Sequence, residues 1–443
     1  MTRRRANADH AELDVWTVGQ ARLDGATLTT FVNGFERSGG APGLQLVGAE
    51  RARSAQRRLV GGVSGVVDCG ASWGCALAVD VGVLSTRYRL RDPDRELGGP
   101  SRSEQIGQRL TERVRLSFAP LDALDVGVGA LVEQQRLAVD AVGEQRASRV
   151  RLRPEGSVVW RVTDEVALAG VGALECHHTD ARLGDALGEG RTCGVLEPTG
   201  RIGARVRPWR WLAFFGNVGR YLRVPTLGEL YGASATVLGN PALTAERAVS
   251  VDAGINAEGR AGSLSFWAQV AGFARWSDDL ITYRRSSFST LRPFNTDQAR
   301  TLGVEVATGA TAWEVLELGG AVTLLDPRDV SADRSLTRDL IPFSARLVVA
   351  PHVGLVSPAW DTVALDEAAV HVSYLHRSSR VADPAGLVIL REQNLLDLDA
   401  SLAFAETVVV RGRIANLLDQ RTVDLVGYPL PGRSFHGMVE ARF

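Results

Sequence analysis

Alternation of apolar and polar residues with a period of two is the feature that most restricts how this chain can fold. In the segment that starts at residue 395, Leu396, Leu398 and Leu402 share one face, while Asp397 and Asp399 share the other. Successive side chains of a β-strand point to opposite faces, so this pattern predicts a strand with one apolar and one polar side. The same alternation predicts further strands at residues 249–256, 264–271 and 434–443.

The composition is poor for long helices and suits many strands and turns, with 47 Gly and only 2 Met. A hydrophobic share of 45% excludes a disordered chain, and a net charge of −1 gives no basic excess that would indicate a nucleic-acid partner. The phosphate-binding, serine-hydrolase and zinc-protease motifs are all missing from the sequence. We therefore expect a protein that is not an enzyme and needs no cofactor or metal.

The sequence contains no run of about 18 apolar residues, so it predicts no transmembrane helix. Membrane β-barrels remain possible, because their strands alternate and leave only a weak hydropathy signal. The basic start Met1–Arg5 is followed by no apolar stretch, so we expect no export signal within the chain. Turn-like stretches at residues 92–94, 257–262 and 383–386 separate the strands. Periodicity alone leaves a membrane barrel and a soluble all-β protein both open.

Four cysteines form two local groups along the chain. Cys69 and Cys75 flank a turn, and Cys176 and Cys193 flank a polar stretch, so two disulfides are possible, as are four unrelated thiols. Cys176, His177 and His178 together with Cys193 could also bind a metal, although their spacing is wider than that of usual zinc ligands.

Four segments, in order, resemble the TonB-dependent outer-membrane receptor family. The first is an Arg-x-Pro-Thr run before Glu-Leu-Tyr, the second a Gly-Asn-Pro-x-Leu-x-x-Glu run, the third a Gly-Val-Glu strand, and the fourth the closing Asn-Leu-x-Asp, Pro-Gly-Arg and terminal aromatic. Leu418 stands where this family usually has Phe. The motif residues are Arg223, Pro225, Glu229, Tyr231, Asn240, Glu246, Gly303, Asn416, Gly432, Arg433 and Phe443. The stretch Gly40–Gly43 followed by Arg53, Arg57 and Arg58 also looks like an early barrel hairpin of this family.

The resemblance implies an all-β fold, a large antiparallel transmembrane β-barrel in the cell outer membrane. With roughly 20 residues for each strand and its connection, the chain would hold about 20–22 strands. Residues 1–443 would then form one barrel domain, without the plug domain, the periplasmic coupling box or a signal peptide.

Asp252 and Glu305 fall on the polar, lumen-facing side of their predicted strands. In this family, two barrel carboxylates at matching positions pair with arginines of the plug; Asp252 stands where Glu is usual. Two other interpretations remain open, that both carboxylates are solvated lumen residues or that they form the acid pair of a glycosidase.

The resemblance implies a receptor or transporter for a scarce nutrient such as a siderophore or cobalamin, in a truncated form. Its partners would be outer-membrane lipid, the barrel-assembly machinery through the C-terminal strand, and the TonB complex only through a missing plug or box. The substrate-binding residues are not identified by the sequence. The alternatives are a plugless relic or open pore, and a soluble all-β binding protein or enzyme.

Overall fold

The structure is a computed structural model that describes residues 6–43, 48–70, 74–140, 144–183, 193–233, 237–285, 290–332, 339–357, 365–405 and 407–441. The chain divides into two compact units. The first comprises Met1–Ala204, Val218–Val249 and Ser277–Asp297, and the second comprises Arg205–Asn217, Ser250–Trp276 and Gln298–Phe443.

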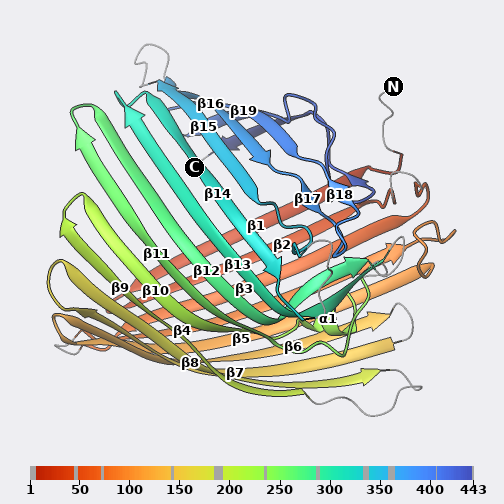
Figure 1. The fold of residues 1–443 in the computed structure, drawn as a ribbon, viewed down its shortest axis with the longest axis horizontal. Helices are drawn as coiled ribbons and strands as arrows, with labels where there is room; N and C mark the ends of the chain where they lie inside the picture. Colours follow the sequence, from red (N-terminus) through yellow and green to blue (C-terminus); the bar gives the residue numbers. More distant parts are fainter. Residues whose placement is uncertain are drawn as a thin grey trace. The chain divides into compact units, whose positions relative to one another are not determined.

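Eight long strands open the chain, and each pairs with the next one in antiparallel fashion (Figure 1). They are β1 (His10–Leu23), β2 (Ala26–Gly40), β3 (Arg53–Asp68), β4 (Ala76–Arg91), β5 (Arg102–Leu121), β6 (Leu124–Asp140), β7 (Glu144–Arg161) and β8 (Val166–Leu183). The turn between β1 and β2 has two residues, with Gly25 at a φ of +70° that only glycine adopts freely. The pairing of Gly40 with Arg53 agrees with the expected early hairpin.

The middle of the chain adds five strands and one short helix. They are β9 (Cys193–Trp209), β10 (Leu212–Arg223), α1 (Leu227–Tyr231), β11 (Glu246–Ala261), β12 (Leu264–Arg285) and β13 (Leu291–Ala312). The turn-like stretch expected at residues 257–262 is wrong in extent, because β11 continues to Ala261. A turn of Gly262 and Ser263 is enough to join β11 to β12, and Gly262 has a φ of +60°.

The last part of the chain continues the antiparallel pairing. Its long strands are β14 (Leu316–Asp329), β15 (Leu347–Ser357), β16 (Leu365–Arg377), β19 (Gln393–Phe404), β20 (Val408–Ala415) and β23 (Ser434–Ala441). Four short strands lie in the connections and form two separate pairs, β17 (Arg380–Val381) with β18 (Ile389–Leu390) and β21 (Val423–Leu425) with β22 (Tyr428–Pro429).

Each long strand separates its side chains onto an apolar face and a polar face. On β11, Val251 and Ile255 are exposed on the apolar face, and Asp252 lies on the polar face between them. In β19, Leu398 pairs with Val372 of β16 and Ile414 of β20, whereas Asp399 pairs with His371 and Arg413. The alternation expected for Leu396, Leu398 and Leu402 is therefore present, and they lie on the apolar face.

The main hydrophobic cluster of the first unit joins α1 to the strands. It comprises Leu137 and Val139 of β6, Ala147 of β7, Ala181 of β8, Leu227, Leu230 and Tyr231 of α1, Leu243, and Ile281 of β12. Leu137 of β6 and Ala147 of β7 project from the face opposite to the exposed Val128 and Val150, and Ala181 pairs with Ala147 on the same side. The cluster thus covers the polar face near one end of the strands.

The all-β antiparallel fold predicted from the sequence is confirmed. In the described residues, one sheet contains 19 strands, slightly fewer than the expected 20–22, because several strands reach 20 to 22 residues. No helix in the described part of the chain has the length and apolarity to cross a membrane.

Candidate functional site

The motif residues between β10 and β11 gather around helix α1 in the first unit. Thr226 caps this helix and forms a capping box with Glu229, in which each side chain bonds the main chain of the other residue. The Glu229 carboxylate is 4% exposed and also accepts hydrogen bonds from Arg223 and, at 3.4 Å, from the hydroxyl of Tyr283 on β12. Glu229 therefore joins the end of β10, the helix and β12.

Asn240 and Glu246 complete the same cluster. The Asn240 amide donates to the carbonyl of Pro293 at 2.9 Å, and its main-chain N–H donates to that of Glu229 at 2.8 Å. The Glu246 carboxylate is buried and lies 3.9 Å from the Arg223 guanidinium. Below, the motif cluster means Arg223, Pro225, Glu229, Tyr231, Asn240 and Glu246, which the structure brings together.

Arg149 of β7 holds the motif cluster against the polar face of the sheet. Its side chain donates to the carbonyl oxygen of Pro225 at 2.7 Å and to the Thr179 hydroxyl on β8 at 2.8 Å. Sequence reasoning missed Arg149 and Tyr283, and no motif marks either residue. The hydrogen bonds within the motif cluster hold the segment around α1 in place at one end of the polar face.

Farther along the polar face of the first unit, charged side chains form a network. Arg151 and Arg153 lie 2.9 Å and 3.2 Å from the carboxylate of Glu175, and His177 contacts the same carboxylate. Arg113 of β5 lies 3.9 Å from Glu155 of β7, across the intervening strand β6. This face therefore presents charge and hydrogen-bonding groups rather than a packed apolar core.

Asp252 and Glu305 both belong to the second unit, on strands β11 and β13. Asp252 accepts a hydrogen bond from the Asn217 amide of β10 at 2.6 Å. Glu305 is exposed and lies opposite Thr323 of β14. A Cβ at the motif residue Gly303 would lie 2.3 Å from the ring of Phe273, so glycine at this position lets that ring lie across β13. The pairing of these two carboxylates with arginines of a plug stays a prediction.

The closing motif assembles in the connection between β20 and β23. Asn416 adopts a φ of +53°, and its side chain bonds the main chain of Gln420 in both directions. Asp419 accepts the Arg433 N–H at 2.9 Å, and a Cβ at Gly432 would lie 2.5 Å from the Asp419 carboxylate. These motif residues therefore fix the loop that leads into the last strand. Phe443 lies outside the described residues.

The cysteines differ from one another in the structure. Cys69 and Cys75 form a disulfide with a Cα–Cα distance of 5.2 Å, whereas Cys176 is a free thiol and forms no second disulfide. Cys193 begins β9, and its side chain lies outside the described residues. His177 is buried on the polar face and His178 is exposed on the other, because neighbours on a strand point apart, so these two histidines do not face the same point.

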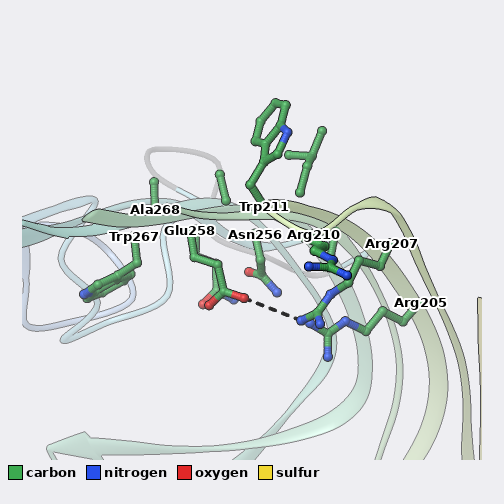
Figure 2. Close-up of a pocket in the computed structure, with 12 residues that line it drawn as sticks. Arg205, Arg207, Arg210, Trp211, Asn256, Glu258, Trp267 and Ala268 are labelled. Atoms are coloured by element: carbon green, nitrogen blue, oxygen red, sulfur yellow. Dashed lines mark ion pairs between the residues drawn. The ribbon is translucent and has the colours of Figure 1, made fainter. Parts of the chain in front are cut away.

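A cavity of about 300 Å³ lies in the second unit where β9–β10 and β11–β12 turn. Figure 2 shows Arg205, Arg207, Glu258 and Trp267 on one side of the strands, with Trp211 on the other. Arg207 lies 3.6 Å from Glu258, while Arg205 has no acidic partner among the described residues. The sequence did not single out this pocket, since no motif covers its residues.

Comparisons with known proteins agree with this architecture. Residues 179–417 match the model of the family "TonB dependent receptor-like, beta-barrel". A relative described as vitamin B12 transporter BtuB, from Photobacterium profundum, is 25% identical over 231 residues. That match covers 51% of this chain and 35% of the transporter, so the chain spans about a third of the length of this relative.

The fold is similar to several solved structures. The copper transporter OprC gives a TM-score of 0.77 at 13% identity, covering 99% of this chain and 73% of that chain. The ferric-catecholate import receptor Fiu of E. coli K12 gives a TM-score of 0.74 at 12% identity, covering 99% of this chain and 76% of that chain. The siderophore receptor PiuA of Acinetobacter baumannii gives a TM-score of 0.76 at 12% identity, covering 98% of this chain and 74% of that chain.

The family match covers more than half of the chain and includes the motif cluster around α1. The chain therefore belongs to the TonB-dependent receptor-like β-barrel family of the outer membrane.

Proposed function

We propose that this chain is the barrel part of an outer-membrane receptor that takes up a scarce nutrient, such as cobalamin or a ferric siderophore. The observation that carries the proposal is the family match over residues 179–417, within which most of the motif cluster lies. The named relatives are a vitamin B12 transporter, a copper transporter and siderophore receptors, which support a metal-containing or metal-binding nutrient.

The polar face supports transport rather than catalysis. Arginines and carboxylates on β5–β8 pair with one another along the strands, as at Arg151 and Glu175. The relatives named above are transporters and receptors, so we propose that the chain is not an enzyme. Its further partners would be the TonB complex, engaged through a plug, and the barrel-assembly machinery, engaged through the C-terminal strand.

Equilibrium dialysis of the detergent-solubilised full chain tests the proposal. Radiolabelled cyanocobalamin and a radiolabelled ferric catecholate siderophore are the probes, and an unrelated porin of similar size is the control. We expect saturable binding of one probe that the unlabelled compound competes away. Binding that rises linearly for both probes, as for the porin, would argue against a nutrient receptor.

Liposome swelling separates the open-pore alternative from a receptor. A chain that forms an open pore lets small sugars enter at a rate that depends on their size, whether or not a nutrient is bound. Extraction from membranes separates the soluble alternative, because only an integral barrel requires detergent for its release.

A further inference from the structure

The apolar face of the first unit carries a row of arginines near one end of its strands. Arg53 of β3 pairs with Arg91 of β4, which in turn pairs with Arg102 of β5. Two rows nearer the strand centres on the same face, Arg57 of β3 pairs with Arg87 of β4. Like charges directly opposite each other destabilise a sheet, so this arrangement calls for negative charge from elsewhere.

Two more arginines continue this surface on β6 and β7. Arg136 pairs with Gln108 of β5 and with Ser148 of β7, and Arg146 pairs with Ala138 of β6. The arginine band is defined here as Arg53, Arg57, Arg87, Arg89, Arg91, Arg102, Arg136 and Arg146.

Acidic residues neutralise only part of the arginine band. Asp9 pairs with Arg53, Glu36 pairs with Arg57, and Glu104 is shared between Arg87 and Arg89. Arg91, Arg102 and Arg136 have no acidic partner within the described part of the chain. The band therefore keeps unpaired positive charge on the same face as the exposed apolar side chains of these strands.

An apolar belt follows directly on the same face of the same strands. It comprises Leu59 and Val63 of β3, Val79, Val81 and Val83 of β4, Val114 of β5, Val128 of β6, and Val150 and Leu152 of β7, all exposed. Val83 and Arg87 are four residues apart, which is about 13 Å along a strand. Exposed valines beside unpaired arginines match a molecule whose acyl chains lie next to an anionic headgroup.

A cavity of about 920 Å³ lies within this surface. Its lining on this face consists of the small residues Ala138 and Ser148 together with Gln108, Arg136, Arg146, Ile106 and Asp180. Leu137, Ala147 and Ala181 also line it, but their side chains belong to the hydrophobic cluster on the other face, so they contribute main chain. The pocket thus offers the guanidinium of Arg136, the amide of Gln108 and the hydroxyl of Ser148 beside the apolar side chain of Ile106. The Asp180 carboxylate in the same lining lies 3.3 Å from the His178 ring.

The strand ends that carry the band are those with the longer connections, such as residues 41–52 and 92–101, whereas two-residue turns join the opposite ends of β1–β2 and β5–β6. In outer-membrane barrels the longer loops face the cell exterior.

We propose that the arginine band binds the phosphate groups of an anionic lipid of the outer leaflet, with one headgroup in the 920 Å³ cavity. Guanidinium groups bind phosphate through charge-assisted, often bidentate hydrogen bonds. The proposal rests on membership of the outer-membrane family and does not depend on which nutrient the chain takes up.

Native mass spectrometry of the full chain in a non-ionic detergent tests this proposal. The lipid probes are diphosphoryl lipid A and zwitterionic dioleoylphosphatidylcholine. The test variant changes Arg91, Arg102 and Arg136 to Gln, and the matched control changes Arg205, Arg207 and Arg210 to Gln, which removes the same charge near the pocket of the second unit. Heat-dependent migration in SDS gels verifies that each variant is folded, and Arg136→Gln alone serves if the triple variant is not.

We expect the test variant to bind diphosphoryl lipid A about tenfold more weakly than the natural chain, with the control within about twofold. Binding of phosphatidylcholine should be equal in all three proteins. Equal loss in the control would show that total charge, not the band, binds the lipid, and an unchanged test variant would overturn the proposal. Inorganic phosphate that displaces the lipid at millimolar concentration would instead identify a site for free anions and would also overturn it.

Discussion

The guanidinium of Arg149 donates a hydrogen bond of 2.7 Å to the main-chain carbonyl of Pro225, 76 residues farther along the chain. Through this bond, strand β7 holds the motif segment that follows β10. A further bond to Thr179 on β8 satisfies another donor of the same buried side chain. One arginine therefore connects two strands with the segment that precedes α1.

Substitution of Arg149 by Met should destabilise the chain. The change removes both hydrogen bonds and leaves the buried Thr179 hydroxyl and Pro225 carbonyl without this partner, which costs about 1–3 kcal/mol of unfolding free energy. Urea titration in detergent micelles measures the effect. Arg205→Met is the control, because Arg205 is exposed, and its effect should stay within about 0.5 kcal/mol. Equal stability of R149M and the natural chain would show that the bond to Pro225 contributes nothing.

The strands could be predicted from the sequence, but the contacts between them could not. Alternation at Leu396 and Asp397 identifies β19 directly, because successive side chains of a strand point to opposite faces. The end of β11 was predicted too early, because Gly259 and Gly262 look alike in the sequence and only Gly262 has a positive φ. Arg149 carries no local signal, since its role depends on a partner that folding brings from far along the chain.

Acidification should loosen the connection between β2 and β3 through Glu96. Its carboxylate accepts the main-chain N–H groups of Glu50, Arg51 and Ala52, and these hydrogen bonds hold the pKa of Glu96 below its ordinary value of 4.5. A carboxyl group with a lowered folded-state pKa stabilises the fold fully above the unfolded-state pKa. That contribution is lost as the pH falls from about 4.5 through the lower folded-state value.

Hydrogen exchange of the amides of Glu50, Arg51 and Ala52 measures this effect. In the natural chain their protection should be constant from neutral pH down to about 5 and should fall below that. In Glu96→Gln the protection should already be lower at neutral pH and should change little with acid. Glu50→Gln is the control, because only the main chain of Glu50 takes part. Protection in E96Q that matches the natural chain at neutral pH would contradict the role of the carboxylate.

Asp252 and Glu305 should bind a plug domain through its arginines. Arginines supplied in trans can form charge-assisted hydrogen bonds with the two carboxylates, although water and salt screen part of the attraction. A plug with its arginines should therefore bind the chain, and D252N/E305Q should weaken that binding. Isothermal titration gives the affinity, and Glu258→Gln serves as control because it removes another polar-face carboxylate of β11. Unchanged affinity in the double variant, or equal loss in E258Q, would exclude a specific role for the pair.

Deletion of Phe443 should impair assembly in the outer membrane. In β23, Phe435 and Val439 are exposed on one face, and the alternation continues in the sequence to Phe443. An aromatic residue at the end of such a strand suits the boundary between lipid and water, where amphipathic rings are favoured. The chain, fused to a signal peptide, is expressed with and without Phe443, and the folded fraction in the outer membrane is measured by heat-dependent gel migration. Phe443→Tyr should assemble normally because it keeps the ring, and normal yield of the shortened chain would refute the prediction.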